Sequence, residues 1–64
     1  MEPVTDTPAA RQEFASYVEA LASELSRLAR GHNLPTLAYI LDMVRLEARE
    51  AAGRADADKG GTQA

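Results

Sequence analysis

Apolar residues recur at alternating steps of four and three along residues 8–30, which predicts an amphipathic helix. The large members of this stripe are Phe14, Val18, Leu21, Leu25 and Leu28. Their spacing is that of the a and d positions of a packed helix seam. The other side of the predicted helix is polar and carries Gln12, Ser16, Glu19, Ser23, Ser26, Arg27 and Arg30. One face of this helix should therefore be buried.

A second stripe, again at steps of three and four, predicts a helix over residues 35–52. Its main seam is Leu34, Leu37, Leu41, Val44, Ala48 and Ala51. A further apolar set does not belong to that seam and consists of Tyr39, Ile40, Met43 and Leu46. At about 100° per residue, Tyr39 and Leu46 fall roughly 160° away from Leu41. A helix that is apolar around most of its circumference is normally buried from more than one direction, so one neighbouring helix cannot cover it.

Local signals set the predicted ends of both helices. Thr7 can accept a hydrogen bond from a free N–H of the first turn, and Pro8 lacks the N–H that this position would leave unpaired. Gly31 is placed where a left-handed C-terminal cap is expected. Pro35 opens the second helix, and Gly53 is expected to close it.

These signals predict one helical hairpin at residues 8–53, between a disordered arm at 1–7 and a disordered tail at 54–64. The connection of about four residues favours antiparallel helices, so the fold class is an all-α, antiparallel two-helix hairpin. The predicted core within the hairpin consists of Phe14, Leu21, Leu25, Leu37, Leu41 and Val44.

The size of the chain makes association the expected route to stability. A domain of about 60 residues buries only about 60% of the surface that its unfolded chain exposes. The 64 residues include no cysteine and one histidine, which excludes disulfides and the usual structural zinc sites. The remaining ways to stabilise so small a chain are close helix packing and association with other chains.

The second apolar set of the second helix favours association. Leaving four large side chains in water forgoes about 6–12 kcal/mol in sum, which is comparable to the stability of a small domain. We therefore predict a homodimer, a four-helix bundle with Tyr39, Ile40, Met43 and Leu46 at the interface. A higher oligomer or a foreign partner helix would also satisfy the pattern, and isolated surface apolars are the simpler alternative for Tyr39 and Met43.

Charge and hydropathy limit the other partners. The net charge of −3 is unfavourable for binding nucleic acid or an anionic membrane surface. No apolar run approaches the ~20 residues of a membrane span, and the first residues lack the features of a signal peptide. We expect a cytoplasmic location.

Candidate chemical groups are few. His32, the only histidine, falls in the connection, where a solvated loop residue or a helix cap is the simpler interpretation. Carboxylates such as Glu47 and Glu50 would need Glu-x-x-His motifs on facing helices to hold two metal ions, and the sequence has none. We predict no catalytic residue, no metal site, no cofactor and no enzymatic activity.

Two charge pairs are spaced three residues apart, Glu24 with Arg27 and Asp42 with Arg45, and can form weak ion pairs along a helix. Arg45 and Arg49 are like charges four apart. Their spacing suggests an acidic group from another chain between them, with water and counterions as the simpler alternative.

A helix-turn-helix interpretation rests on the stretch LARGHNLPTLAYIL, a helix followed by a glycine-containing turn and a second helix. A recognition helix needs polar or basic side chains near its start, and this one begins with Thr36, Leu37, Ala38, Tyr39 and Ile40. DNA binding therefore stays a minor alternative.

The stretch LPTLAYILDMVRLEA at residues 34–48, preceded by SELSRLAR and a glycine turn, resembles short alphaproteobacterial-type helical-hairpin proteins of uncharacterised function. The likeness covers about 35 residues, including Leu37, Tyr39, Leu41, Asp42 and Met43. It implies a helical hairpin and no particular activity.

A looser likeness is to the sporulation aspartyl-phosphate phosphatases, two-helix hairpins that bind a response regulator. Their Ser-Gln-Glu-Leu-Asp motif is matched here only by Met-Val-Arg-Leu-Glu at residues 43–47, without the Ser, the Gln and the final Asp. The favoured function is a non-enzymatic oligomerisation or protein-interaction module, with a regulatory role as one option. An adaptor for a response-regulator-like signalling partner and a small DNA-binding regulator are the alternatives.

Overall fold

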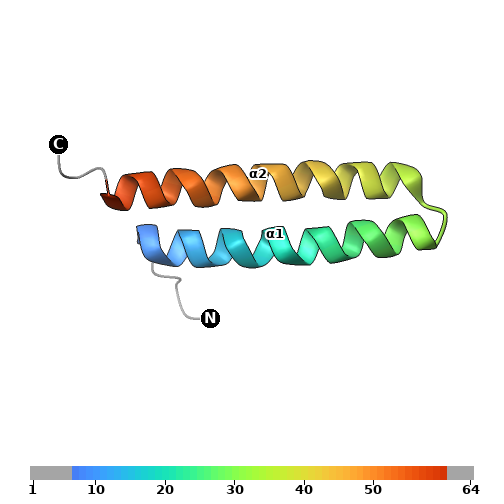
Figure 1. The fold of residues 1–64 in the computed structure, drawn as a ribbon, viewed down its shortest axis with the longest axis horizontal. Coiled ribbons are helices and arrows are strands. Elements are labelled where there is room, and N and C mark those ends of the chain that lie inside the picture. The colour runs from blue at the N-terminus through green and yellow to red at the C-terminus, as the bar shows by residue number, and fades with distance from the viewer. Residues whose placement is uncertain (1–6, 61–64) are drawn as a thin grey trace, which may run out of the picture.

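The chain folds as two α-helices joined by a short turn (Figure 1). The computed structural model describes residues 7–60, with side chains described as far as residue 55. Helix α1 spans Pro8–Gly31 and helix α2 spans Pro35–Gly60. The two helices lie side by side and antiparallel, so that the start of α1 and the end of α2 form one end of the molecule, the open end, opposite the turn. The predicted all-α class and the helical hairpin are confirmed.

The start of α1 follows the expected capping chemistry. Thr7 has an extended backbone, and its Oγ1 accepts a hydrogen bond of 3.0 Å from the backbone N–H of Ala10. Pro8 occupies the first helical position, where its missing N–H leaves no donor unpaired. The predicted disordered arm lies, except for this capping residue, outside the residues that the structure describes.

The turn reverses the chain through a Schellman motif. The N–H of Leu34 donates to the carbonyl of Ala29 at 2.9 Å, and the N–H of Asn33 donates to the carbonyl of Arg30 at 3.1 Å. The left-handed residue is Asn33, with a φ of 63°, so the left-handed cap predicted at Gly31 is wrong. Because Pro35 restricts Leu34 to extended geometry, the reversal must be completed at the residue just before Leu34. Asparagine tolerates that conformation better than most residues.

Helix α2 is longer than predicted, because it passes through Gly53 and continues to Gly60. The predicted end of the helix at residue 52, the hairpin boundary at 53 and the tail beginning at 54 are therefore wrong. A glycine inside a helix costs only about 1 kcal/mol relative to alanine. Beyond it, the buried side chain of Ala55 and the ion pair of Arg54 with Glu47 add local contacts. Residues 61–64 lie outside the described range.

The contact between the helices is made by small side chains. Helix α1 buries Ala15, Ala22, Ser26 and Ala29, and α2 buries Ala38, Ala48 and Ala55. Several of these residues recur at intervals of seven, the spacing of a seam between two long helices. Small side chains at such a seam let the two backbones approach closely, since the interaxial distance depends on the side chains between the helices. We call these seven residues the small-residue seam.

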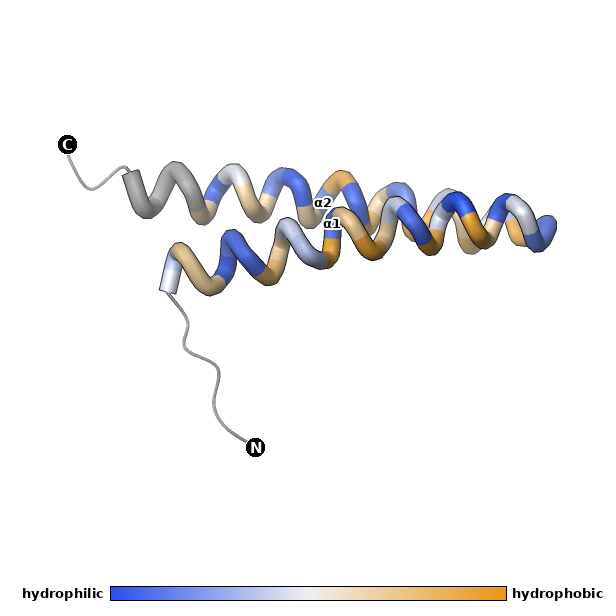
Figure 2. Tube along the Cα trace, turned by 60° about the horizontal axis from the view of Figure 1, so that its bottom comes forward, coloured by the Kyte–Doolittle hydropathy of each residue, from blue (hydrophilic) through white to orange (hydrophobic). Residues whose placement is uncertain are grey.

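The predicted core of large side chains is wrong. Phe14 is 68% exposed, Leu21 is 43% exposed, and Leu25, Leu37 and Val44 are also exposed, while Leu41 is half-buried. On α1 the leucine stripe lies next to the alanine stripe, about 50–100° around the helix, and the structure turns the alanines toward α2. Figure 2 shows hydrophobic positions recurring along both helices. In the described residues no large apolar side chain is fully buried.

Candidate functional site

The large apolar side chains of the two helices meet on one side of the hairpin. Phe14 and Val18 of α1 line a groove together with Ile40, Met43 and Val44 of α2. Residues seven positions away along a helix return to the same side, which adds Leu21, Leu25 and Leu28 of α1 and Leu37 of α2 to this surface. We call this surface the apolar face, and its members are Phe14, Val18, Leu21, Leu25, Leu28, Leu37, Ile40, Met43 and Val44.

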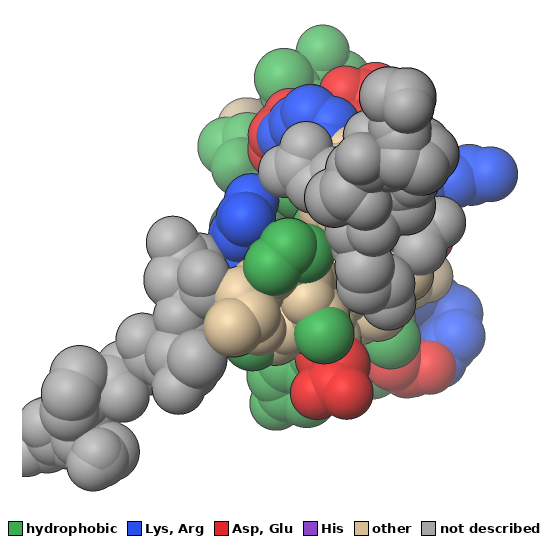
Figure 3. All heavy atoms as spheres, turned by 90° about the vertical axis from the view of Figure 1, so that its left-hand side faces the viewer, with side chains coloured by type: hydrophobic (Ala, Val, Ile, Leu, Met, Phe, Trp, Pro, Cys, Tyr) green, Lys and Arg blue, Asp and Glu red, His purple; other side chains and the backbone are tan. Residues whose placement is uncertain are grey.

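The lining of the groove runs from Ile40 and Met43 on the turn side to Phe14 and Ala51 nearer the open end. The volume of the groove is about 450 Å³, and the small side chains of Ala15, Ala48 and Ala51 contribute to its lining. Among the described side chains, the one charged member of the lining is Glu47, which accepts a hydrogen bond of 2.8 Å from Arg54. Seen from the open end in Figure 3, hydrophobic side chains reach the surface beside charged ones. The groove is therefore apolar, with its single carboxylate already paired.

The four side chains predicted at an interface are all exposed, between 48% and 63%. The structure does not place them on one surface, however. Ile40 and Met43 line the groove. Tyr39 and Leu46 are seven residues apart and lie about 150° around α2 from Val44, on the outer edge of the hairpin. Contact of any of these residues with a partner stays a prediction.

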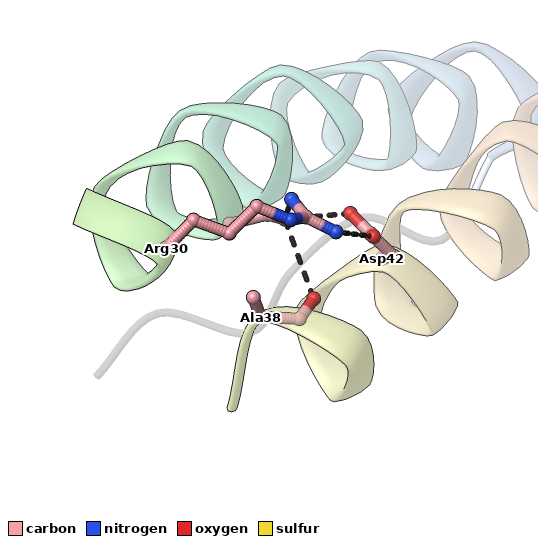
Figure 4. Close-up of polar contacts among 4 residues, drawn as sticks. Arg30, Ala38 and Asp42 are labelled. Carbon is pink, nitrogen blue, oxygen red and sulfur yellow. Dashed lines mark hydrogen bonds and ion pairs between the residues drawn. The ribbon is translucent and has the colours of Figure 1, made fainter. Parts of the chain in front are cut away.

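A polar network joins the helices on the side opposite the apolar face. Ser26 of α1 is 2% exposed, and its Oγ donates to Asp42 Oδ1 of α2 at 2.6 Å. Arg30 of α1 donates from Nη1 to Ser26 Oγ at 2.6 Å and from Nη2 to Asp42 Oδ2 at 2.5 Å. The carbonyl of Ala38 lies farther from Ser26 Oγ, at 3.3 Å, than the carboxylate of Asp42, so the single hydroxyl proton is donated mainly to Asp42. Figure 4 shows Arg30 reaching across from α1 to Asp42.

This network lowers the pKa of Asp42 below its ordinary value of 3.8. The main causes are the hydrogen bonds that its carboxylate accepts from Ser26 and Arg30, with smaller electrostatic contributions from Arg30 and Arg45. Both carboxylate oxygens are held by partners on α1, so the charged form of Asp42 fixes the relative position of the helices. The chemistry of this site is that of a structural clamp.

The sequence pattern did not reveal the clamp. Asp42 was expected to pair with Arg45 on its own helix, whereas its ion-pair partner is Arg30 on α1. The polarity of Ser26 predicts a place on the polar side of α1, although its spacing from Ala22 and Ala29 places it in the alanine stripe. That spacing is the sequence signal that could have identified Ser26 as a residue of the contact between the helices. The expected pair of Glu24 with Arg27 is present, and both side chains are exposed.

The remaining candidate chemistry is sparse over residues 7–55. His32 is exposed, and its Nδ1 lies 2.9 Å from the carbonyl oxygen of Leu28 at the end of α1, as expected of a helix cap. Within the described residues, His, Asp and Glu side chains form no group of three that could hold a metal ion. Neither described helix is apolar over enough of its length to cross a bilayer.

The arrangement of the helices gives no support to a helix-turn-helix interpretation. The helices of that motif cross at about 90–120°, whereas α1 and α2 run antiparallel along their lengths.

The chain matches no family model, and neither a curated protein nor a solved structure is similar to it. The resemblance to alphaproteobacterial-type hairpin proteins stays a prediction.

Proposed function

We propose that this chain is a non-enzymatic, cytoplasmic interaction module that associates with a second copy of itself through the apolar face. The product is a four-helix bundle whose interior is formed by the large side chains that each hairpin leaves exposed. One observation supports this proposal above all others. The two helices of the hairpin contact each other through alanine and serine, while its phenylalanine and all its leucines except the half-buried Leu41 are exposed.

The energetic argument follows from that observation. Fully burying a large apolar side chain contributes about 1.5–3 kcal/mol. The nine members of the apolar face are on average about half exposed, so covering them is worth roughly 10 kcal/mol. The seam of alanines within one hairpin offers much less apolar area. Covering the apolar face therefore supplies stabilisation of the size of a small domain's total stability.

A second copy is the simplest partner that covers this face. Most soluble oligomers are symmetric homo-oligomers, and a two-fold interface uses the same surface on both subunits. A continuous apolar face on both helices of a hairpin is the pattern that buries itself when two hairpins stack. The charged clamp on the other side would then face solvent, as the amphipathic pattern of α1 requires.

The proposal is tested by the mass of the full chain in solution between 1 and 100 µM. We expect sedimentation or light scattering to give twice the monomer mass of 6.9 kDa. Met43→Asp places a charge in the apolar face, and we expect it to raise the dissociation constant by about 100-fold or more and to lower helicity. Ala20→Asp changes the charge equally at an exposed position of α1 outside that face and should leave the mass unchanged.

A wild-type chain that is fully helical and sediments at 6.9 kDa across this range would contradict self-association. A chain that is weakly helical alone and gains helicity only when another protein is added would instead favour the adaptor alternative.

A further inference from the structure

Large and small side chains are unevenly distributed along the apolar face. Helix α1 carries large side chains from Phe14 at the open end to Leu28 near the turn. Helix α2 carries them only near the turn, from Leu37 to Val44, and then turns to alanine. The face is therefore thicker near the turn than beyond Val44, where Ala48 and Ala51 line the groove.

We infer that the second copy docks on the apolar face with its turn at the opposite end of the bundle. This inference rests on the self-association proposed above and adds its geometry. When two copies stack with opposite ends together, the thick half of each covers the thinner half of the other. Over the length of α1 between Phe14 and Leu28, each cross-section then receives large side chains from both α1 helices and from at least one α2 helix.

The alternative two-fold arrangement puts both turns at the same end. It stacks the thick half on the thick half and the groove on the groove. The four helices would have to splay apart at the turns or leave a void at the open end. Protein interiors are packed to the density of organic crystals, with few voids larger than a water molecule, so an even cross-section is favoured.

The available area also fits a second copy. Taking about 150 Å² for a large apolar side chain, the lower end of the area that an aromatic side chain buries, the exposed part of the apolar face amounts to roughly 600 Å² per hairpin. Stable interfaces bury about 800 Å² per partner. The ten residues outside the described range include only two large apolar side chains, Met1 and Val4, which are too few to cover this face.

Among the described residues that line the groove, docking would bury no unpaired charge. Glu47 is the charged residue of the groove lining, and Arg54 on the same helix already holds its carboxylate. Burying an ion pair is far less costly than burying a lone charge. Tyr39 and Leu46, on the outer edge of α2, are left outside this interface.

The orientation is measurable because the chain contains no cysteine, so a single introduced thiol carries the only spin label. His32→Cys places the label in the turn, and Ala9→Cys places it at the open end, both at exposed positions. A helix of 24 residues is about 36 Å long, so copies with opposite ends together should show turn-to-turn distances above about 30 Å. Mixed dimers labelled at the turn of one copy and the open end of the other should give distances of about 20 Å, the width of two helices.

A turn-to-turn distance of about 20 Å or less would overturn the inferred orientation and leave self-association intact. A monomeric mass for the labelled chains would overturn both proposals. As a second arm, Leu46→Asp should leave the dimer mass unchanged while Met43→Asp abolishes it. The reverse result would place the interface on the outer edge of α2 and contradict the inference.

Discussion

Ser26 occupies a position of the small-residue seam that alanine fills elsewhere on α1, and its hydroxyl group gives that position an added role. An alanine there would pack without a polar contact, whereas Ser26 accepts a hydrogen bond from Arg30 and donates one to Asp42. Buried polar groups need such partners, and the described side chains include no buried polar atom without one. The clamp therefore specifies one register of α1 against α2, which a purely alanine seam would define less sharply.

The clamp makes the stability of the hairpin depend on pH. Because the folded state lowers the pKa of Asp42, the unfolded chain takes up this proton more readily than the folded chain as the pH falls. The stabilisation is complete above the ordinary pKa of 3.8 and is lost as the pH falls through the lower, folded value. We therefore expect the urea midpoint of the wild-type protein to decrease as the pH is lowered through this acidic range, and that of Asp42→Asn to decrease less.

Glu50→Gln serves as a control, because it removes an exposed carboxylate from the same helix and should keep the wild-type dependence of the midpoint on pH. An equal dependence on pH for the wild type and Asp42→Asn would refute the role of the clamp.

At the scale of the elements, the ends set by rigid local chemistry were predictable and the packing was not. The Thr7 cap and the starts at Pro8 and Pro35 follow from backbone restrictions that act within a few residues. At Gly31 the predicted helix end is right, but the left-handed residue is Asn33. The end predicted at Gly53 is wrong, because glycine permits a helix end without requiring one.

The choice of seam could not be read from hydrophobicity. Both stripes of α1 have helical spacing, and the more hydrophobic one was assigned to the partner helix within the chain. Which stripe faces α2 depends on how closely two backbones can approach and on the cross-helix contact of Ser26 with Asp42. Neither the approach of the two backbones nor this contact can be inferred from the sequence pattern of one helix alone. The sequence therefore indicated an apolar excess on α2 correctly, while the apolar face shared by both helices became apparent only from their packing.

The small-residue seam is testable by enlarging one of its members. Ala22 is 3% exposed and faces α2, so Ala22→Leu should force the helices apart and cost about 1–3 kcal/mol in the free energy of unfolding. Ala20→Leu makes the same change at an exposed position of the same helix and should alter stability by less than about 0.5 kcal/mol. Both are measured by urea denaturation at one protein concentration. If the leucine stripe formed the contact with α2 instead, Ala22→Leu would be tolerated as well as Ala20→Leu.

At the scale of the whole molecule, folding and association are expected to be one process. A hairpin whose interior is alanine and serine has little apolar area of its own to offset the entropy of ordering two helices of 24 and 26 residues. The apolar face supplies the missing area only when it is covered. The monomer should therefore be marginally stable, and the folded state should depend on how much protein is present.

Concentration is thus the variable that separates a self-sufficient hairpin from an obligate assembly. For a folded dimer in equilibrium with unfolded chains, each tenfold rise in concentration adds about 1.4 kcal/mol to the apparent stability of the dimer. For a protein of this size, each tenfold step corresponds to a rise in melting temperature of about 5 °C. The melting temperature is measured by circular dichroism at 222 nm at concentrations from 1 to 100 µM. Met43→Asp should melt at a lower temperature that does not change with concentration, whereas Leu46→Asp should keep the wild-type dependence. A wild-type melting temperature that stays constant over this range would mean that one hairpin is stable with its apolar face in water.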